Sequence, residues 1–283
     1  MRLSIGFSPC PNDTFIFDAL INQKINTGEF SFDLVMAEVE TLNTWALEGK
    51  LDITKLSLPA YFRSMNHYHL LKSGSALGKS VGPLLIANQE ISLEQFTFQK
   101  TTVAVPGLNT TANLLLDFAL PGIEHKIFLR YDEIENYLLT ESLNPKFGVL
   151  IHENRFTYQQ KGFFKVLDLG DYWETKMNVP IPLGSIAIKK SIPVQVAERI
   201  ETLIQNSLQY AWQHYPYLSK FVKENSQEME EDIMRKHIQL YVNEYSMDIG
   251  DQGRIAIDKL YATFQKNSLN NKPDSSSSLF SNS

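Results

Sequence analysis

Short runs of β-branched and apolar residues alternate with amphipathic runs over the first ninety positions. Strands are expected at residues 3–7, 30–36 and 52–58, separated by helices at residues 14–20 and Val39–Leu47. Alternation of this kind is typical of βα units whose strands form a largely parallel sheet. The pattern therefore predicts an α/β protein.

Prolines and capping residues set the boundaries of these elements. Pro9 and Pro11 argue against helix in the loop after the first strand, and Asn12 or Asp13 is expected to cap the helix that follows. Pro59 stands at an expected helix start directly after the third strand. Each of these loops would lead from the carboxyl end of a strand into a helix N-terminus.

A second βα series begins in the middle of the chain. It contains a strand at Thr102–Val105, a helix at residues 112–119 whose apolar positions keep helical spacing, and a strand at residues 147–151. A glycine-rich loop at residues 74–82 separates it from the first series. The two series predict two sheets.

Two apolar runs are expected to carry the chain between these sheets, at residues 83–87 and 183–188. We therefore expect lobe I to comprise residues 1–88 and 186–267, and lobe II to comprise residues 89–185. A length of 283 residues is enough for two lobes, each with its own core.

Helical patterning dominates the last part of the chain. Apolar residues fall on one face of a helix from Val196 to Ala211 and again over residues 257–264. Residues 268–283 are rich in Asn and Ser and are expected to form a disordered tail. Two βα lobes with two crossings and returning helices describe a two-lobed periplasmic-binding-protein-like (type 2) fold, in which ligand binds in a central cleft.

Composition narrows the function classes. The net charge of -6, with no strongly basic stretch, argues against nucleic acid and anionic membranes as partners. Cys10 is the single cysteine, so no intramolecular disulfide is possible and a reducing compartment is favoured. The N-terminal apolar run is too short for a signal peptide, and no run is long enough to span a membrane. We expect a cytoplasmic protein that binds a small molecule.

The candidate site residues stand where strands end, because ligands of open α/β sheets bind beyond the carboxyl ends of strands. Four segments qualify: the loop that contains Asn12, the strand end at Ser57, the helix start at 109–112, and His152. A helix N-terminus offers backbone N–H groups to a carboxylate. Capping alone is the more common role for residues such as Thr110 and Thr111, and a structural hydrogen bond is the more common role for Ser57.

His152 is the best candidate for a general base, since its imidazole titrates near neutral pH and it follows an apolar strand. A structural role is an equal alternative at this point. If the strand continued, Arg155 would share its side and could bind an acidic substrate, although an ion-paired arginine is more common.

Metal and nucleotide sites do not fit the spacing. His67 and His69 could share one side of a strand, but no third ligand stands nearby. Gly74, Gly78 and Gly82 match neither a Walker nor a dinucleotide motif. We expect no metal and no nucleotide cofactor.

Motifs over residues 6–184 resemble those of the 1,4-dihydroxy-6-naphthoate synthase family of the futalosine route to menaquinone. They are GFSPCPNDTFIF at 6–17, ETLN at 40–43, TKLS at 54–57, ALG at 76–78, VGPL at 81–84, VPG at 105–107, TTA at 110–112, IHE at 151–153, RFTY at 155–158 and PLG at 182–184. YVN at 241–243, with Asp248 and Gly250, adds a C-terminal match. The tail after Asn267 is not a feature we associate with the family.

The resemblance implies a lyase that acts on cyclic dehypoxanthinyl futalosine without metal or redox cofactor. It implies His152 as general base. Substrate-contacting positions of the family fall on Lys55, Leu56, Ser57, Thr111 and Ala112. Asn12, Thr110 and Arg155 are further possible contacts.

Two alternatives stay open. One is an enzyme like chorismate dehydratase, which shares the fold and the pathway. The other is a cytoplasmic small-acid binding protein, because this fold more often binds small anions than transforms them. The sequence leaves the oligomeric state undetermined.

Overall fold

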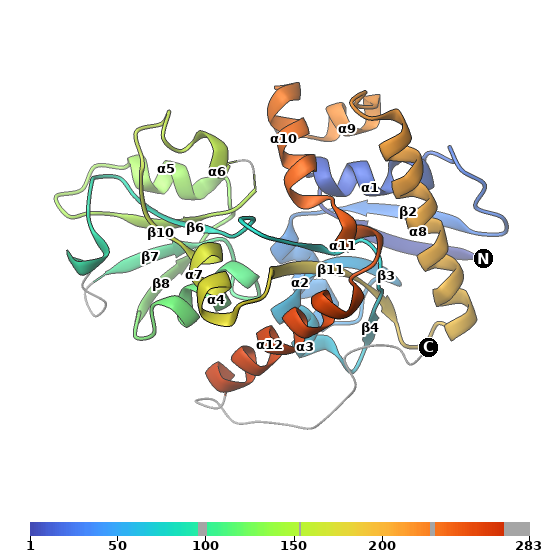
Figure 1. Cartoon of the computed structure of the whole chain (residues 1–283), viewed down its shortest axis with the longest axis horizontal. Helices are drawn as coiled ribbons and strands as arrows, with labels where there is room; N and C mark the ends of the chain where they lie inside the picture. Colours follow the sequence, from blue (N-terminus) through green and yellow to red (C-terminus); the bar gives the residue numbers. More distant parts are fainter. Residues whose placement is uncertain (96–100, 153, 227–229, 269–283) are drawn as a thin grey trace.

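The protein is built around two β-sheets, as the computed structural model shows for residues 1–95, 101–152, 154–226 and 230–268 (Figure 1). The first sheet has the strand order β2-β1-β3-β11-β4, and β5 also pairs with β11. Its strands are β1 (Arg2–Phe7), β2 (Ser31–Met36), β3 (Ile53–Ser57), β4 (Tyr68–Leu70), β5 (Ala76–Gly78) and β11 (Ile181–Lys189). We call this sheet and the helices packed on it lobe I.

The second sheet has the order β10-β6-β9-β7-β8. Its strands are β6 (Leu84–Ala87), β7 (Thr102–Val105), β8 (His125–Phe128), β9 (Phe147–Leu150) and β10 (Phe164–Asp168). Strand β1 is parallel to β2 and β3 in the first sheet, and β7 is parallel to β8 and β9 in the second. Strands β11, β6 and β10 run antiparallel to their neighbours. This sheet and its helices are lobe II, on the left in Figure 1.

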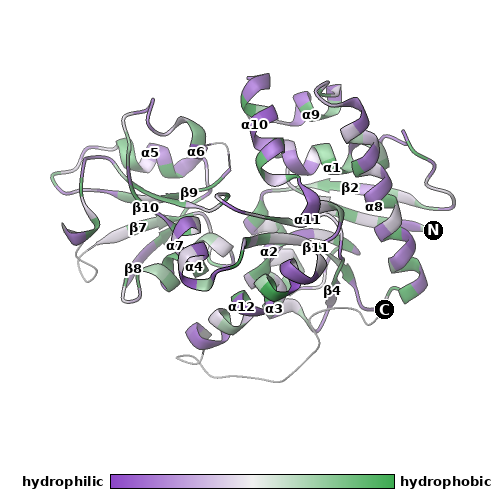
Figure 2. Ribbon diagram, in the orientation of Figure 1, coloured by the Kyte–Doolittle hydropathy of each residue, from purple (hydrophilic) through white to green (hydrophobic). Residues whose placement is uncertain are grey.

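Helices flank both sheets. Lobe II carries α4 (Thr111–Ala119), α5 (Glu133–Leu139), α6 (Asn154–Thr157) and α7 (Leu169–Met177). Lobe I carries α1 (Pro11–Ile21), α2 (Val39–Leu47), α3 (Leu58–Ser64), α8 (Val194–His214), α9 (Lys220–Asn225), α10 (Glu231–Tyr241), α11 (Glu244–Met247) and α12 (Gly250–Ser268). Helix α1 packs against α8, α9 and α10. Hydrophilic and hydrophobic stretches alternate along α8 in Figure 2, as the sequence pattern predicts.

The structure confirms most of the predicted elements, but it places strand β5 inside the predicted glycine-rich loop and moves the start of α1. Helix α1 starts at Pro11, with Cys10 at its N-cap and no side-chain cap, so Asn12 and Asp13 do not cap it. Proline fits the first turn of a helix because the N–H it lacks would have no partner there. Asn12 and Asp13 are therefore inside the first turn, where their side chains are free for other contacts.

The chain passes from the first sheet to the second and back again. Strand β5 belongs to the first sheet and β6 to the second, so the chain enters lobe II before residue 88. Strand β11 returns the chain to the first sheet from Ile181 onward. The predicted tail, 268–283, lies outside the described residues from position 269 onward.

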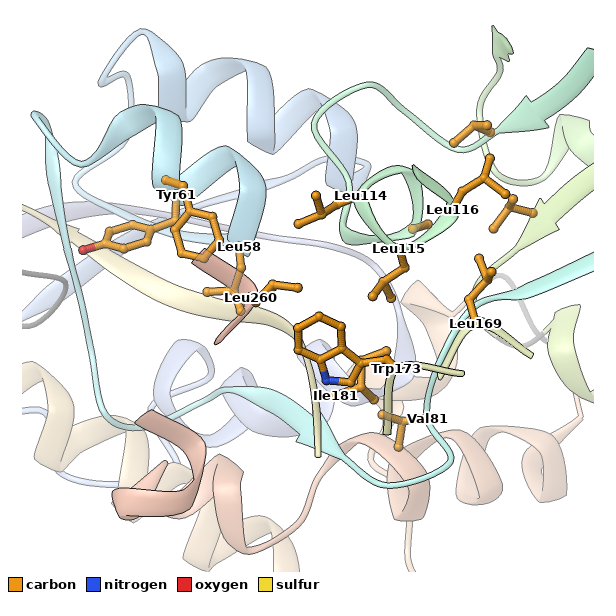
Figure 3. Close-up of a cluster of buried hydrophobic side chains, with 14 of the residues drawn as sticks. Leu58, Tyr61, Val81, Leu114, Leu115, Leu116, Leu169, Trp173, Ile181 and Leu260 are labelled. Atoms are coloured by element: carbon orange, nitrogen blue, oxygen red, sulfur yellow. The ribbon is translucent and has the colours of Figure 1, made fainter. Parts of the chain in front are cut away.

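A hydrophobic cluster contains buried side chains of both lobes (Figure 3). Tyr61 and Leu260 of lobe I belong to the same cluster of buried side chains as Leu115 and Trp173 of lobe II. Trp173 and Tyr61 are fully buried. Burial of aromatic side chains contributes strongly to stability. The cluster thus brings buried apolar side chains of both lobes into contact beside the pocket described next.

No helix within the described ranges is both long enough and apolar enough to cross a membrane.

Candidate active site

A pocket between the two lobes is lined by residues of both. Lobe I contributes the loop after β1, the end of β3 and one face of α10. Lobe II contributes the start of α4 and the end of β9. The lining residues are Ser8, Asn12, Asp13, Val39, Lys55, Leu56, Ser57, Ala76, Val81, Pro83, Thr110, Thr111, Ala112, Ile151, His152, Leu183, Gly184, His237 and Tyr241. Most of the pocket is therefore formed where strands end and helices begin.

Helix starts supply much of the polar surface. The N-terminal ends of α1, α3 and α4 reach the pocket through Asn12, Ser57 and Thr111. Thr110 caps α4, and its Oγ1 accepts from the N–H of Asn113 at 3.2 Å. The N–H groups of Thr111 and Ala112 belong to the first turn, which has no intrahelical acceptor for them. This end of the pocket therefore favours an anion.

A buried ion pair lies at the floor of the pocket. Lys55 Nζ is 3.1 Å from Asp13 Oδ1, and the two side chains are 7% and 4% exposed. Lys55 also donates to the carbonyl of Gly74, and the Asp13 carboxylate accepts from Ser8 Oγ and Asn12 Nδ2. The charge of Asp13 is thus neutralised and its oxygens are occupied.

Ser57 is held by a network that reaches the other lobe. Its N–H donates to Asn43 Oδ1 at 2.8 Å, and Asn43 Nδ2 donates to Ser57 Oγ at 3.2 Å. Glu40, one turn earlier on α2, accepts from the backbone N–H and the side-chain amide of Asn109 in lobe II. The position of the Ser57 hydroxyl is therefore fixed by α2, which also contacts lobe II.

His152 follows β9 in a left-handed backbone conformation, with φ of 57°. This conformation ends the strand, and the short helix α6 follows. The ring contacts Tyr131 edge-on at 4.7 Å between centroids, and Nδ1 is 3.5 Å from Cys10 Sγ. Its Nε2 has no hydrogen-bond partner among the residues that the structure describes. Nε2 is thus the buried ring nitrogen whose hydrogen-bonding capacity these residues do not use.

Burial lowers the pKa of His152 from 6.5 to about 4, and the nearby Asp13 carboxylate opposes this shift in part. The imidazole is therefore neutral at pH 7. A neutral imidazole can accept a proton, which is what a general base requires.

Eight of the nine residues singled out in the sequence line this one pocket. They are Asn12, Lys55, Leu56, Ser57, Thr110, Thr111, Ala112 and His152. Arg155 is not among the lining residues: it lies in α6, and its Nη2 is 3.8 Å from Asp168 Oδ2. Strand β9 ends at Leu150, so Arg155 does not share a strand face with His152.

Sequence reasoning missed His237 and Tyr241 as pocket residues and took Asp13 for a cap. His237 stands on the buried face of α10, with Met234, Ile238 and Tyr241. A histidine on the apolar face of an amphipathic helix is the signal that could have identified it.

The described part of the chain contains no cluster of three or more His, Cys, Asp or Glu side chains that could hold a metal ion. The single carboxylate in the pocket lining, Asp13, is paired with Lys55.

Two lobes with a pocket between them define a protein of the periplasmic-binding-protein fold. A Candida albicans protein described as having the generic periplasmic binding protein fold superposes with a TM-score of 0.68 at 12% identity, over 97% of this chain and 92% of that one. A crystal structure from Archaeoglobus fulgidus superposes with a TM-score of 0.87 at 29% identity, over 95% of this chain and 98% of that one. The predicted fold class is confirmed.

The chain belongs to the menaquinone biosynthesis family, whose sequence model matches residues 3–266. A 1,4-dihydroxy-6-naphthoate synthase of Thermus thermophilus is 37% identical over 94% of this chain and 95% of its own length. The Streptomyces coelicolor enzyme of the same name is 34% identical over 90% of each chain. The family resemblance carried by the sequence motifs is confirmed, and the named relatives are enzymes.

Proposed function

We propose that the protein is a 1,4-dihydroxy-6-naphthoate synthase that acts in the cytoplasm on cyclic dehypoxanthinyl futalosine. The observation that carries the proposal is the near-complete coverage of two enzymes of that name, at 37% and 34% identity. The pocket supports it independently, because it combines a neutral imidazole, an anion-binding helix start and apolar walls.

In the proposed mechanism His152 Nε2 removes a proton from a hydroxyl of the sugar-derived part of the substrate. The electron pair of that O–H bond forms a carbonyl, and the adjacent carbon–carbon bond breaks. Its electrons pass into the second ring, which becomes aromatic. Aromatisation supplies the driving force, so the protein mainly has to hold the substrate within reach of the base and exclude water.

The substrate would be held by groups of both lobes. The proposed carboxylate site is the start of α4, at the N–H groups of Thr111 and Ala112, with the Ser57 hydroxyl opposite. Leu56 offers apolar contact to the rings, and Lys55, Asn12 and Thr110 complete the polar surroundings. Arg155 stays a possible further contact of the proposal: it is not among the lining residues, but it lies close enough to His237 to lower the pKa of that ring.

Direct conversion tests the proposal. Purified protein treated with chelator is mixed with cyclic dehypoxanthinyl futalosine, and dihydroxynaphthoate is followed by absorbance and mass. We expect product at the same rate with and without chelator, since the proposed chemistry uses an imidazole and backbone N–H groups. Chorismate serves as the control substrate. Turnover of chorismate alone, or tight binding of a small acid without turnover, would replace the proposal with a different function.

The pH profile of kcat/KM is expected to stay level from pH 7 down to about pH 5 and to fall with an apparent pKa near 4. The sign follows from the base: protonation of His152 disables it, and burial lowers its pKa from 6.5 to about 4. Asp13, Cys10, His237 and Tyr131 are the titratable groups around the ring. An acid limb centred at pH 6.5 in protein that stays folded, by circular dichroism, would contradict the assignment.

A further inference from the structure

His237 faces His152 across the lobe boundary. It lies on α10 of lobe I, is 1% exposed, and lines the pocket that contains His152 of lobe II. The two imidazole rings are nearly parallel, with an interplanar angle of 11° and 6.1 Å between centroids. The mechanism proposed above does not use this second histidine.

A chain of hydrogen bonds fixes the proton on the His237 ring. Asp13, paired with Lys55, can only accept, so it is the amide nitrogen of Asn12 that faces it at 2.8 Å. The amide oxygen of Asn12 then faces His237 Nε2 at 2.9 Å. Because that oxygen can only accept, Nε2 carries the hydrogen. The ring is held in one tautomer and one orientation by lobe I.

Burial also keeps His237 neutral. Its pKa is lowered well below the ordinary value by burial first, and further by His152 and Arg155. A ring that is neutral and already hydrogen-bonded through its N–H is suited to packing rather than to proton transfer.

The His152 ring, by contrast, depends on lobe I for its orientation. Tyr131 contacts it from its own lobe, but Cys10 Sγ at 3.5 Å from Nδ1 and the parallel His237 ring both come from lobe I. The backbone of His152 stands at the end of a strand, where it does not by itself fix the side chain.

We propose that His237 is a positioning residue for His152: held by Asn12 in lobe I, its ring directs Nε2 of His152 toward the substrate when the lobes are together. The inference rests on the proposed function, in which His152 is the base. The substrate proton passes to His152, and His237 exchanges none. The base would thus be correctly oriented only in the assembled cleft.

Two variants of His237 distinguish a ring that orients His152 from a ring that takes part in proton transfer. His237→Ala removes the ring, and we expect kcat to fall about 100-fold with KM within about 3-fold, since a misplacement of about 1 Å costs on that order. His237→Phe keeps a flat ring and is expected to restore kcat to within about 10-fold of the parent. The acid limb of kcat/KM is expected to stay near pH 4 in both. His69→Ala, on β4 of lobe I and outside the pocket lining, is the control and should change neither constant.

Side-chain ¹⁵N NMR of the histidines gives a readout that needs no turnover. In the parent we expect His152 to show one tautomer, in His237→Ala an average of both tautomers, and in His237→Phe the parental signals. If the parent makes no product, the proposed function fails, and the NMR comparison still decides the positioning role. Unchanged His152 signals in His237→Ala would overturn the proposal. A raised KM with parental kcat in His237→Ala would also overturn it, as would a His237→Phe variant as slow as His237→Ala.

Discussion

Replacing His152 with Asn is expected to lower turnover by about 10²- to 10⁴-fold, the usual contribution of a general base. Asn is the informative choice because position 152 has φ of 57°, and Asn adopts the left-handed conformation more readily than most residues. The backbone around the pocket should therefore stay in place. Steady-state kinetics with cyclic dehypoxanthinyl futalosine would measure the effect.

Binding should survive this substitution, since the carboxylate site lies at the start of α4 and not at His152. We expect the Kd of the product, measured by calorimetry, to change by less than about 3-fold, well under 1 kcal/mol. His125→Asn is the matched control: the same change in lobe II, at an exposed position on β8. Turnover of His152→Asn within about 3-fold of His125→Asn would remove His152 from the role of base.

Replacing Lys55 with Met is expected to lower the free energy of unfolding by about 3–5 kcal/mol, because it leaves the Asp13 carboxylate buried without its partner. Lys55 and Asp13 are 7% and 4% exposed, so water compensates poorly for the lost ammonium group. The loss also removes the hydrogen bond to the Gly74 carbonyl. Chemical denaturation at pH 7 would measure it.

A second ion pair on the same sheet provides the control. Lys189 Nζ is 3.4 Å from Asp52 Oδ1, with side chains 26% and 31% exposed, so Lys189→Met should cost about 1 kcal/mol or less. Adding Asp13→Asn to Lys55→Met should recover part of the lost stability, because no unpaired charge then remains. Equal losses in the free energy of unfolding for Lys55→Met and Lys189→Met would mean that burial of the Lys55–Asp13 pair does not increase its contribution to stability.

The elements could be predicted from the sequence because their patterns are local. Helix α2 and strand β7 have the predicted bounds, and the expected apolar face of α4 is buried. The start of α1 was predicted wrongly, since Pro11 is compatible with a first helical turn and Cys10 takes the N-cap position without a side-chain bond. Local sequence preferences allow the helix to start either at Pro11 or after a cap at Asn12 or Asp13.

The candidate site residues were predicted from strand ends and family motifs, and the position of Arg155 outside the pocket lining shows the limit of that reasoning. Arg155 was placed by assuming that the strand continued past His152. The left-handed conformation of His152 instead ends β9 and leads into α6. A positive φ at a residue other than Gly is uncommon, and nothing in the neighbouring sequence indicates it.

The sequence by itself determined the main strands and helices of both βα series, the family, and which strand ends carry polar residues. These follow from periodicity and motifs within short windows. The tertiary structure alone decided that His237 meets Asn12 over 225 positions of sequence, that Cys10 meets His152 over 142, and that Asp13 is an ion-pair partner instead of a cap. Such contacts depend on how two sheets and a returning helix pack in space, and no local preference encodes that packing.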